Sequence, residues 1–285
     1  MAIFPGSAIP SGVTTYTIDQ SLRFNLGDSA SLSRTPGSDG NRKTWTFSFW
    51  YKCVDPSFPG DRDILSDSQA GSPTDEHWFR FGIRGTNNQL LLFPGYNYNI
   101  YATDAFFRDV GAWYHIVLRV DTTQASFDDR LRIYVNNELK AITNVSSGPS
   151  GEPPQDWVTG INSTDKQELM VYSYGTDLFV PGYLAEVYMI DGLSLAPSSF
   201  GETDEDTNQW KPIDASGLTF GTNGFYQKYG SDGGYTSFTT PGANTWTCPA
   251  GVTEVQLLVV AGGGGGGGGV NAGGGAGGGG LLEDA

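Results

Sequence analysis

The sequence is poor in the side chains that most often carry chemistry. Its 285 residues include only two histidines, two cysteines and three methionines. His77 precedes an expected strand and His115 lies within one, and nothing in their spacing brings them together with carboxylates. Cys53 and Cys248 are far apart, so we expect buried free thiols, with a single long-range disulfide as the alternative. Catalysis by a cysteine–histidine pair is not expected, because Cys53 falls on the apolar side of its strand.

Positive charge and long apolar runs are also scarce. Lys and Arg number 16 against 31 Asp and Glu, which gives a formal net charge of −15. An acidic body repels phosphate, so nucleic acid is not an expected partner. No apolar stretch approaches the ~18 residues of a transmembrane helix, so we expect no membrane insertion. The opening residues, "MAIFPGSAIPSG", lack the basic and apolar regions of a signal peptide.

Aromatic residues and a period-two pattern are abundant. The chain has 16 Phe, 14 Tyr and 7 Trp for a core, and 41 Gly and 15 Pro for turns. In the stretch 44–53, one face is aromatic or apolar: Trp45, Phe47, Phe49, Tyr51 and Cys53. The other face carries Thr46, Ser48 and Lys52, with Trp50 among them. This alternation predicts a half-buried strand with an aromatic inner face.

The remaining segments favour the same class of structure. Alternation recurs at 113–121 and 131–140, where Asn136-Asn137 can supply the positive φ of a tight hairpin turn. No segment carries a helical apolar stripe over three turns. Many short strands separated by turns predict an all-β fold, a sandwich of two antiparallel sheets.

The last fifty residues differ in kind from the rest. Two expected strands lead into a run of 8 glycines at 262–269. A glycine run is either a flexible tether or a set of extended backbones packed closely in an oligomer, and both interpretations stay open. It is not a phosphate-binding loop, because no Lys-Ser/Thr follows the glycines. We expect four parts: an N-terminal arm (1–13), the sandwich (14–200), an acidic and aromatic connector packing on it (201–235), and the start of a glycine-rich module (236–285).

The loop "FPGYNYNIYATDAFF" is the best candidate binding site in the sequence. Tyr96, Tyr98 and Tyr101 could stack on sugar rings while Asn99 bonds hydroxyl groups. The alternatives are a strand with exposed tyrosines and a contact with another protein.

A second loop, "DTTQASFDDR", is a calcium candidate. Asp121, Asp128 and Asp129 flank it, but their spacing matches no dedicated calcium loop. Aspartates are also common turn residues. Calcium is therefore the only cofactor considered, and no metal site is assigned.

Four segments, in order, resemble the elements of a concanavalin A-like, laminin-G-type jelly-roll domain. They are "SLRFNLGDSASLSRTPGSDGNRKTWTFSFWYK", "AWYHIVLRVDTT", "LRIYVNNELK" and "YLAEVYMIDGLSL". The connector, "SSFGETDEDTNQWKPIDASGLTFGTNGFYQKY", is similar to the segment that follows such domains in virion proteins of tailed bacteriophages, especially marine ones. "FTTPGANTWTCPAGVTEVQLLVVAGGGGGGG" is similar to the opening of glycine-rich domains in phage tail fibres.

These resemblances imply a structural protein of the virion, made in the cytoplasm of a bacterial host. The expected role is a tail fibre or tail appendage that helps the particle attach to the host surface. The alternatives are a capsid-attached head fibre or decoration protein, and a carbohydrate-binding lectin module. Expected partners are other tail or capsid proteins, a host cell-surface glycan, and further copies in a homo-oligomer, most often a trimer.

Catalysis is not expected. The glycan hydrolases of the resembling fold place Glu, Asp and Glu at alternating strand positions. In "LAEVYMID", Glu186 stands alone among apolar residues and Asp191 begins the turn. No catalytic residue is assigned, and a glycan hydrolase remains the weakest alternative.

Overall fold

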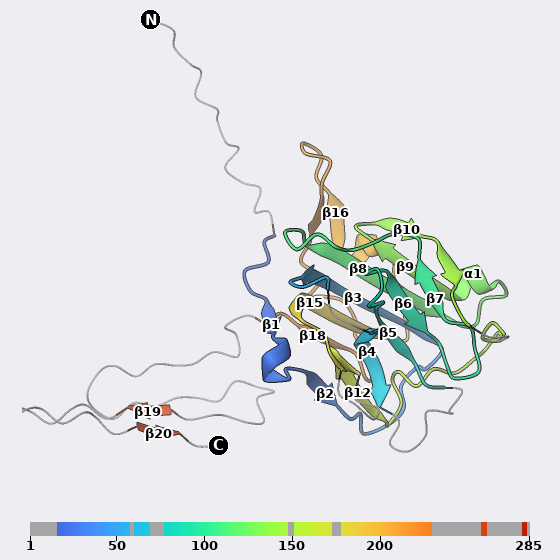
Figure 1. Ribbon diagram of the computed structural model, residues 1–285, viewed down its shortest axis with the longest axis horizontal. Helices are drawn as coiled ribbons and strands as arrows, with labels where there is room; N and C mark the ends of the chain where they lie inside the picture. The colour runs from blue at the N-terminus through green and yellow to red at the C-terminus, as the bar shows by residue number, and fades with distance from the viewer. Residues whose placement is uncertain are drawn as a thin grey trace, which may run out of the picture. The chain divides into compact units, whose positions relative to one another are not determined.

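The computed structural model describes residues 16–57, 60–68, 77–147, 151–172, 178–229, 258–260 and 281–283. The chain divides into two compact units, residues 1–233 and residues 234–285. In the first unit, two antiparallel sheets pack face to face (Figure 1). This architecture confirms the all-β sandwich that the alternation predicted. No helix in the described ranges is long and apolar enough to cross a membrane.

Sheet A contains the longest strands of the chain. Its order is β1-β15-β3-β8-β9-β10, and β18 also pairs with β15. The bounds are β1 (Leu22–Phe24), β3 (Thr44–Cys53), β8 (Tyr114–Asp121), β9 (Leu131–Val135), β10 (Glu138–Lys140), β15 (Gly182–Asp191) and β18 (Phe225–Gln227).

Sheet B faces sheet A and has the order β11-β7-β6-β5-β4-β12-β2. Its strands are β2 (Leu32–Arg34), β4 (Arg62–Ser68), β5 (Arg80–Ile83), β6 (Leu90–Phe93), β7 (Tyr101–Thr103), β11 (Ile142–Asn144) and β12 (Lys166–Leu169).

Short elements complete the described structure. The two-stranded pairs are β13 (Val171–Tyr172) with β14 (Leu178–Phe179), β16 (Gly201–Thr203) with β17 (Trp210–Pro212), and β19 (Leu258–Val260) with β20 (Leu281–Glu283). The helical turns are η1 (Leu26–Asp28), α1 (Phe127–Arg130) and η2 (Pro197–Ser199). The hairpin formed by β16 and β17 extends away from the sheets (Figure 1).

The core lies between the two sheets, where the predicted inner face of β3 is fully buried. Trp45 packs edge-on against Phe79 at a centroid distance of 5.1 Å, and Phe49 meets Phe81 at 6.4 Å. Such aromatic pairs contribute roughly 0.5–1.5 kcal/mol each beyond their buried area. Cys53 is a buried free thiol at the end of this strand, while Cys248 lies outside the described residues.

The prediction that β3 is only half buried is wrong. Thr46 and Ser48 on its second face are fully buried, because the connector covers that face of sheet A. Phe200, just before the connector, and Ala215 of the connector form a second apolar cluster with Val117, Tyr188 and Ile190 of the sheet. The Thr46 hydroxyl is satisfied there: it donates to the carbonyl of Leu193 at 2.8 Å and accepts from the N–H of Leu195 at 2.8 Å.

The end of β15 is tied to three loops through one buried carboxylate. Asp191 accepts hydrogen bonds from the backbone N–H of Asn41 at 2.7 Å and of Asn223 at 2.8 Å. It also accepts one from the side-chain amide of Asn162 at 3.3 Å. Gly221 passes so close, at φ +81°, that a Cβ there would lie 2.1 Å from the Asp191 carbonyl oxygen. The carboxylate thus joins the connector to the sandwich.

Replacing Asp191 by asparagine is expected to lower the free energy of unfolding by about 2 kcal/mol. The substitution removes the charge that strengthens these bonds and turns an amide N–H₂ toward a group that also donates. Urea denaturation of both proteins measures the difference. Asp214→Asn is the matched control, because the Asp214 carboxylate lies in an exposed turn and bonds Ser216 locally. Equal, small effects of the two substitutions would argue against this role for Asp191.

Candidate functional site

The four residues predicted as a sugar-binding loop do not share one surface. Tyr96 is 52% exposed, but Tyr98 packs edge-on against Trp157 with ring centroids 5.7 Å apart. Asn99 is buried, and Tyr101 lies buried in β7 with its ring 4.8 Å from that of Phe127. Only Tyr96 of the four therefore offers an exposed aromatic face.

The calcium candidates make the contacts of turn residues. Asp121 accepts hydrogen bonds from the Thr123 hydroxyl at 2.6 Å and the Gln124 side-chain amide at 2.7 Å. Asp128 and Asp129 lie in the first turn of α1, and Asp129 pairs with Arg132. Among the described residues, no group of three histidine, cysteine or acidic side chains could hold a metal ion.

His115 is buried on the outer side of sheet A, between a serine and a tryptophan. The Trp210 indole N–H donates to its Nδ1 at 2.9 Å, and its Nε2 lies 2.9 Å from the Ser48 hydroxyl. Because indole nitrogen can only donate, Nδ1 accepts and the ring proton is on Nε2, which donates to Ser48. Burial lowers the pKa of His115 to about 3, so the ring is neutral at pH 7. With its proton on Nε2, His115 cannot take the proton of Ser48, and the pair is structural.

Two tryptophans from distant parts of the chain, Trp50 and Trp210, stack on His115, and a third, Trp113, lies near them. Trp50 comes from β3, Trp113 directly precedes β8, and Trp210 belongs to β17 of the connector. Trp50 stacks on the His115 ring at 5.0 Å, and Trp210 does so at 5.9 Å with an interplanar angle of 23°. Trp50 retains 8% exposure, while Trp113 and Trp210 are partly exposed. The stacking and the indole hydrogen bond fix the Trp50 and Trp210 rings in place.

The tryptophans line an open hollow of about 500 Å³, the first hollow, together with two turns rich in amide side chains. One is the β9–β10 turn with Asn136 and Asn137, whose φ angles of 49° and 68° confirm the predicted hairpin geometry. The other is the β16–β17 turn with Asn208 and Gln209. The Asn136 side-chain oxygen accepts a hydrogen bond from the backbone N–H of His115 at 2.9 Å, so this turn is anchored to β8.

A second hollow, of about 460 Å³, shares Trp50 and Trp113 with the first. Its remaining lining comes from residues 16–21, Ala185, Lys211 and Pro212. Beside it, Glu186 sits in a bulge of β15 at φ 48° and is buried. Its carboxylate accepts hydrogen bonds from the hydroxyls of Tyr188 at 2.5 Å and Tyr226 at 2.7 Å. Burial, above all, raises the pKa values of Tyr188 and Tyr226 well above the ordinary value of a tyrosine. This carboxylate is thus a structural group.

The charge on this surface is largely paired. Lys211 lies 3.0 Å from Asp204 and 3.3 Å from Glu202. Their hydrogen bonds raise the pKa of Lys211, while bonds from Thr207 and Lys211 hold the pKa of Asp204 well below its usual range. Glu138 of the first hollow is paired with Lys140 at 2.7 Å.

The two hollows therefore combine indole rings with amide side chains. Indole rings can stack on sugar rings, and amides can form hydrogen bonds with hydroxyl groups.

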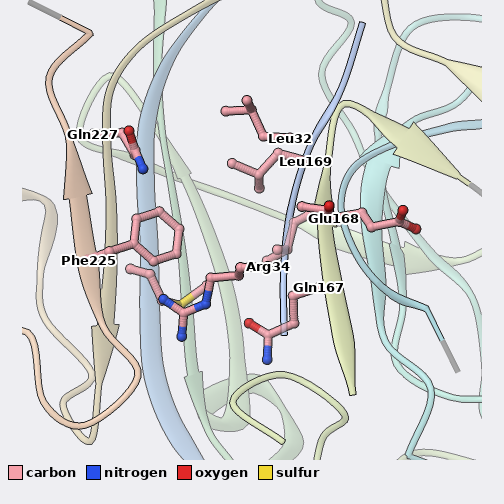
Figure 2. A pocket seen from close by; sticks show the side chains of 10 residues that line it. Leu32, Arg34, Gln167, Glu168, Leu169, Phe225 and Gln227 are labelled. Atoms are coloured by element: carbon pink, nitrogen blue, oxygen red, sulfur yellow. The ribbon is translucent and has the colours of Figure 1, made fainter. Parts of the chain in front are cut away.

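A smaller cavity at the edge of the sandwich is of another kind. It measures about 130 Å³ and lies between β2 and β12 of sheet B and β18 of sheet A. Figure 2 shows the guanidinium of Arg34 beside the Phe225 ring, 4.9 Å from its centroid. Arg34 also donates to the carbonyl of Asn223 at 2.5 Å. The cavity is smaller than the roughly 300 Å³ at which ligand pockets begin, so its contacts serve to hold β18 in place.

Two parts of the sequence match known protein families. The model of the concanavalin A-like lectin/glucanases superfamily matches residues 26–192, and that of a glycine-rich domain matches residues 239–284. The chain belongs to the concanavalin A-like lectin/glucanases superfamily. The resemblances of the sandwich to a concanavalin A-like, laminin-G-type domain and of the last segment to a glycine-rich domain are thereby confirmed at the level of the domain families. No curated protein matches this superfamily member.

Solved structures with a similar fold include three of different kinds. A heptameric SAP-like pentraxin from Limulus polyphemus is 13% identical, with 57% of this chain and 70% of that one covered and a TM-score of 0.39. Tailspike protein 2 from an Escherichia coli O157:H7 bacteriophage is 12% identical, with 63% and 23% covered and a TM-score of 0.41. The CBM40 of a Ruminococcus gnavus IT-sialidase, bound to α2,3-sialyllactose, is 15% identical, with 58% and 92% covered and a TM-score of 0.36. The aligned part spans about a quarter of the tailspike's length.

Proposed function

We propose that this chain is a carbohydrate-binding attachment module of a virion appendage. The observation that carries the proposal is the convergence of Trp50, Trp113 and Trp210 with two amide-bearing turns on the outer side of sheet A. The Trp50 and Trp210 rings are held by stacking on His115, so little ordering of these two rings is needed when a ligand arrives. Membership of a superfamily that includes lectins supports the same role.

Binding is favoured over hydrolysis by the placement of carboxylates. Glycosidases commonly use two carboxyl groups about 5–10 Å apart across the bond that is cleaved. Among the described residues, the first hollow is lined by one carboxylate, Glu138, and the second by one, Asp19. Glu186 is buried beneath its tyrosines and faces neither hollow as a free acid. This arrangement supports a module that holds a glycan without cleaving it.

The virion assignment rests on the resemblance of the connector and of the glycine-rich part to phage appendage proteins. A tail fibre or tail appendage is the favoured place, and a capsid-attached fibre is the alternative. Partners would be neighbouring virion proteins and further copies of the chain around a symmetry axis. Mass spectrometry of purified virions, followed by immunogold labelling, tests this. A protein absent from virions would contradict the assignment and leave the glycan site to be tested separately.

Trp113→Ala is expected to weaken glycan binding about tenfold or more, because partly exposed tryptophans at binding surfaces commonly dominate affinity. The ring is partly exposed and meets Tyr183 edge-on at 6.3 Å, so the thermal midpoint should change little. Binding of the full chain to the glycan selected on an array is measured by calorimetry.

Tyr96→Ala is the matched control, since Tyr96 is an exposed aromatic residue in the loop first indicated by the sequence. It should bind like the unmodified chain. Loss of binding in Tyr96→Ala with retention in Trp113→Ala would move the site to that loop.

A further inference from the structure

The two hollows on sheet A are neighbours with a common wall. Trp50 and Trp113 line both, while the amide turns line only the first and residues 16–21 line only the second. A ligand that fills both must therefore pass over these two indole rings. This continuity sets the length and the chemistry of the ligand.

We propose that the ligand is the interior of an extended, uncharged oligosaccharide chain, bound lengthwise across both hollows. The inference rests on the proposed function and deepens it, because it names the class of glycan that the same surface selects. The two hollows, of about 500 and 460 Å³, are each within the roughly 300–1,000 Å³ typical of small-ligand pockets. A terminal sugar alone would fill only one of them.

Both hollows are built before a ligand arrives. In the first, the Trp210 indole is hydrogen-bonded to His115, and the Asn136 side chain is bonded to the backbone of β8. In the second, the start of the wall formed by residues 16–21 is held by the Tyr16 hydroxyl, which lies 3.3 Å from the Tyr226 hydroxyl. On binding, the entropy loss from ordering therefore falls largely on the ligand, because the protein side of the site is already in place.

The charges lining the hollows disfavour an acidic sugar. Lys211 is the one cation among the described lining residues, and it is paired with Glu202 and Asp204. Asp19 adds negative charge to the second hollow, and the chain as a whole carries a formal net charge of −15. A carboxylated sugar would have to lose water without gaining a cationic partner, and it would be repelled on approach. Hydroxyl groups, in contrast, match the amides of Asn137, Asn208 and Gln209.

The experiment measures binding of the full chain to three neutral series, glucan, mannan and galactan oligosaccharides, each from monosaccharide to hexasaccharide. Oligogalacturonides and sialyllactose are the acidic probes. Within the best neutral series, the hexasaccharide should bind at least about tenfold more tightly than the disaccharide, and the acidic probes should bind more weakly. Gln209→Ala in the first hollow and Gln20→Ala in the second should each weaken hexasaccharide binding, with Tyr96→Ala as the unaffected control.

Each other result counts against a defined part of the scheme. Binding that does not increase beyond a monosaccharide, or that responds to only one of the two glutamine substitutions, overturns the extended site and leaves the glycan-binding function standing. Trp113-dependent binding of only the acidic probes likewise overturns the uncharged class alone. If no probe binds at all, the proposed glycan-binding function falls, and this inference falls with it.

Discussion

Asp63→Ala is expected to lower the free energy of unfolding of the sandwich by about 3–5 kcal/mol, because it leaves a buried guanidinium without its anion. Arg80 Nε and Nη2 donate to the two carboxylate oxygens of Asp63 at 2.6 and 3.0 Å. Asp63 is 2% exposed and Arg80 is 9% exposed. The guanidinium also lies 3.9 Å from the centroid of the Tyr172 ring. Removing the Asp63 carboxylate leaves the charged Arg80 guanidinium buried among aromatic rings without an anionic partner.

The double variant Asp63→Leu/Arg80→Met is the control that separates the pair from its packing. A buried ion pair replaced by apolar side chains of similar size is often close to neutral in stability. Urea unfolding followed by tryptophan fluorescence should therefore show the double variant to be clearly more stable than Asp63→Ala. A double variant as unstable as the single one would mean that packing around these positions, and not the unpaired charge, sets the cost.

The second large effect is a loss of stability in acid that depends on His115. Its pKa is lowered to about 3 in the folded protein by burial, whereas an unfolded histidine titrates near pH 6.5. Below about pH 6.5, His115 binds a proton in the unfolded chain but stays neutral in the folded chain. The free energy of unfolding therefore falls progressively as the pH drops toward 3. The full contribution is roughly 4–5 kcal/mol, present above about pH 6.5 and lost by about pH 3.

His115→Gln tests this through the slope of stability against pH. The amide can accept from Trp210 and donate to Ser48, but it does not titrate, and it loses the stacking on Trp50. The variant should be less stable than the unmodified chain at pH 7, and the gap should narrow steadily down to about pH 4. If the free energies of unfolding of the two proteins changed in parallel with pH over this range, His115 would have the same pKa in the folded and unfolded states, contrary to this prediction.

Several features of the fold were accessible from the sequence because they depend on local patterns. The alternation from Trp45 to Cys53 identified the inner face of β3, and Asn136-Asn137 identified a turn with two left-handed residues. The burial of Thr46 and Ser48 was not accessible, because it depends on a connector that lies far away in the sequence. Alternation reports one packed face and carries no information about what covers the other.

The candidate site was missed for the same reason. Trp50, Trp113 and Trp210 come from three separate segments, and only the folded chain brings them together. One signal was present: Trp50 stood on the otherwise polar face of its strand, where a large apolar residue needs a partner. The packing of Tyr98 and Tyr101 in the tyrosine loop was not accessible either, because their aromatic partners come from other segments.

The cover that the connector forms over sheet A also bears on how such a module can be inherited or transplanted. The superfamily match ends at Gly192, yet Phe200 and Ala215 of the outer cluster and the Trp210 wall lie beyond that point. A gene segment that ended there would encode a sheet whose outer apolar face is exposed to water. It would also lack Trp210, one of the three tryptophans of the site. Exchange of this module between proteins therefore has to carry the connector through the end of β18 at Gln227 together with the sandwich.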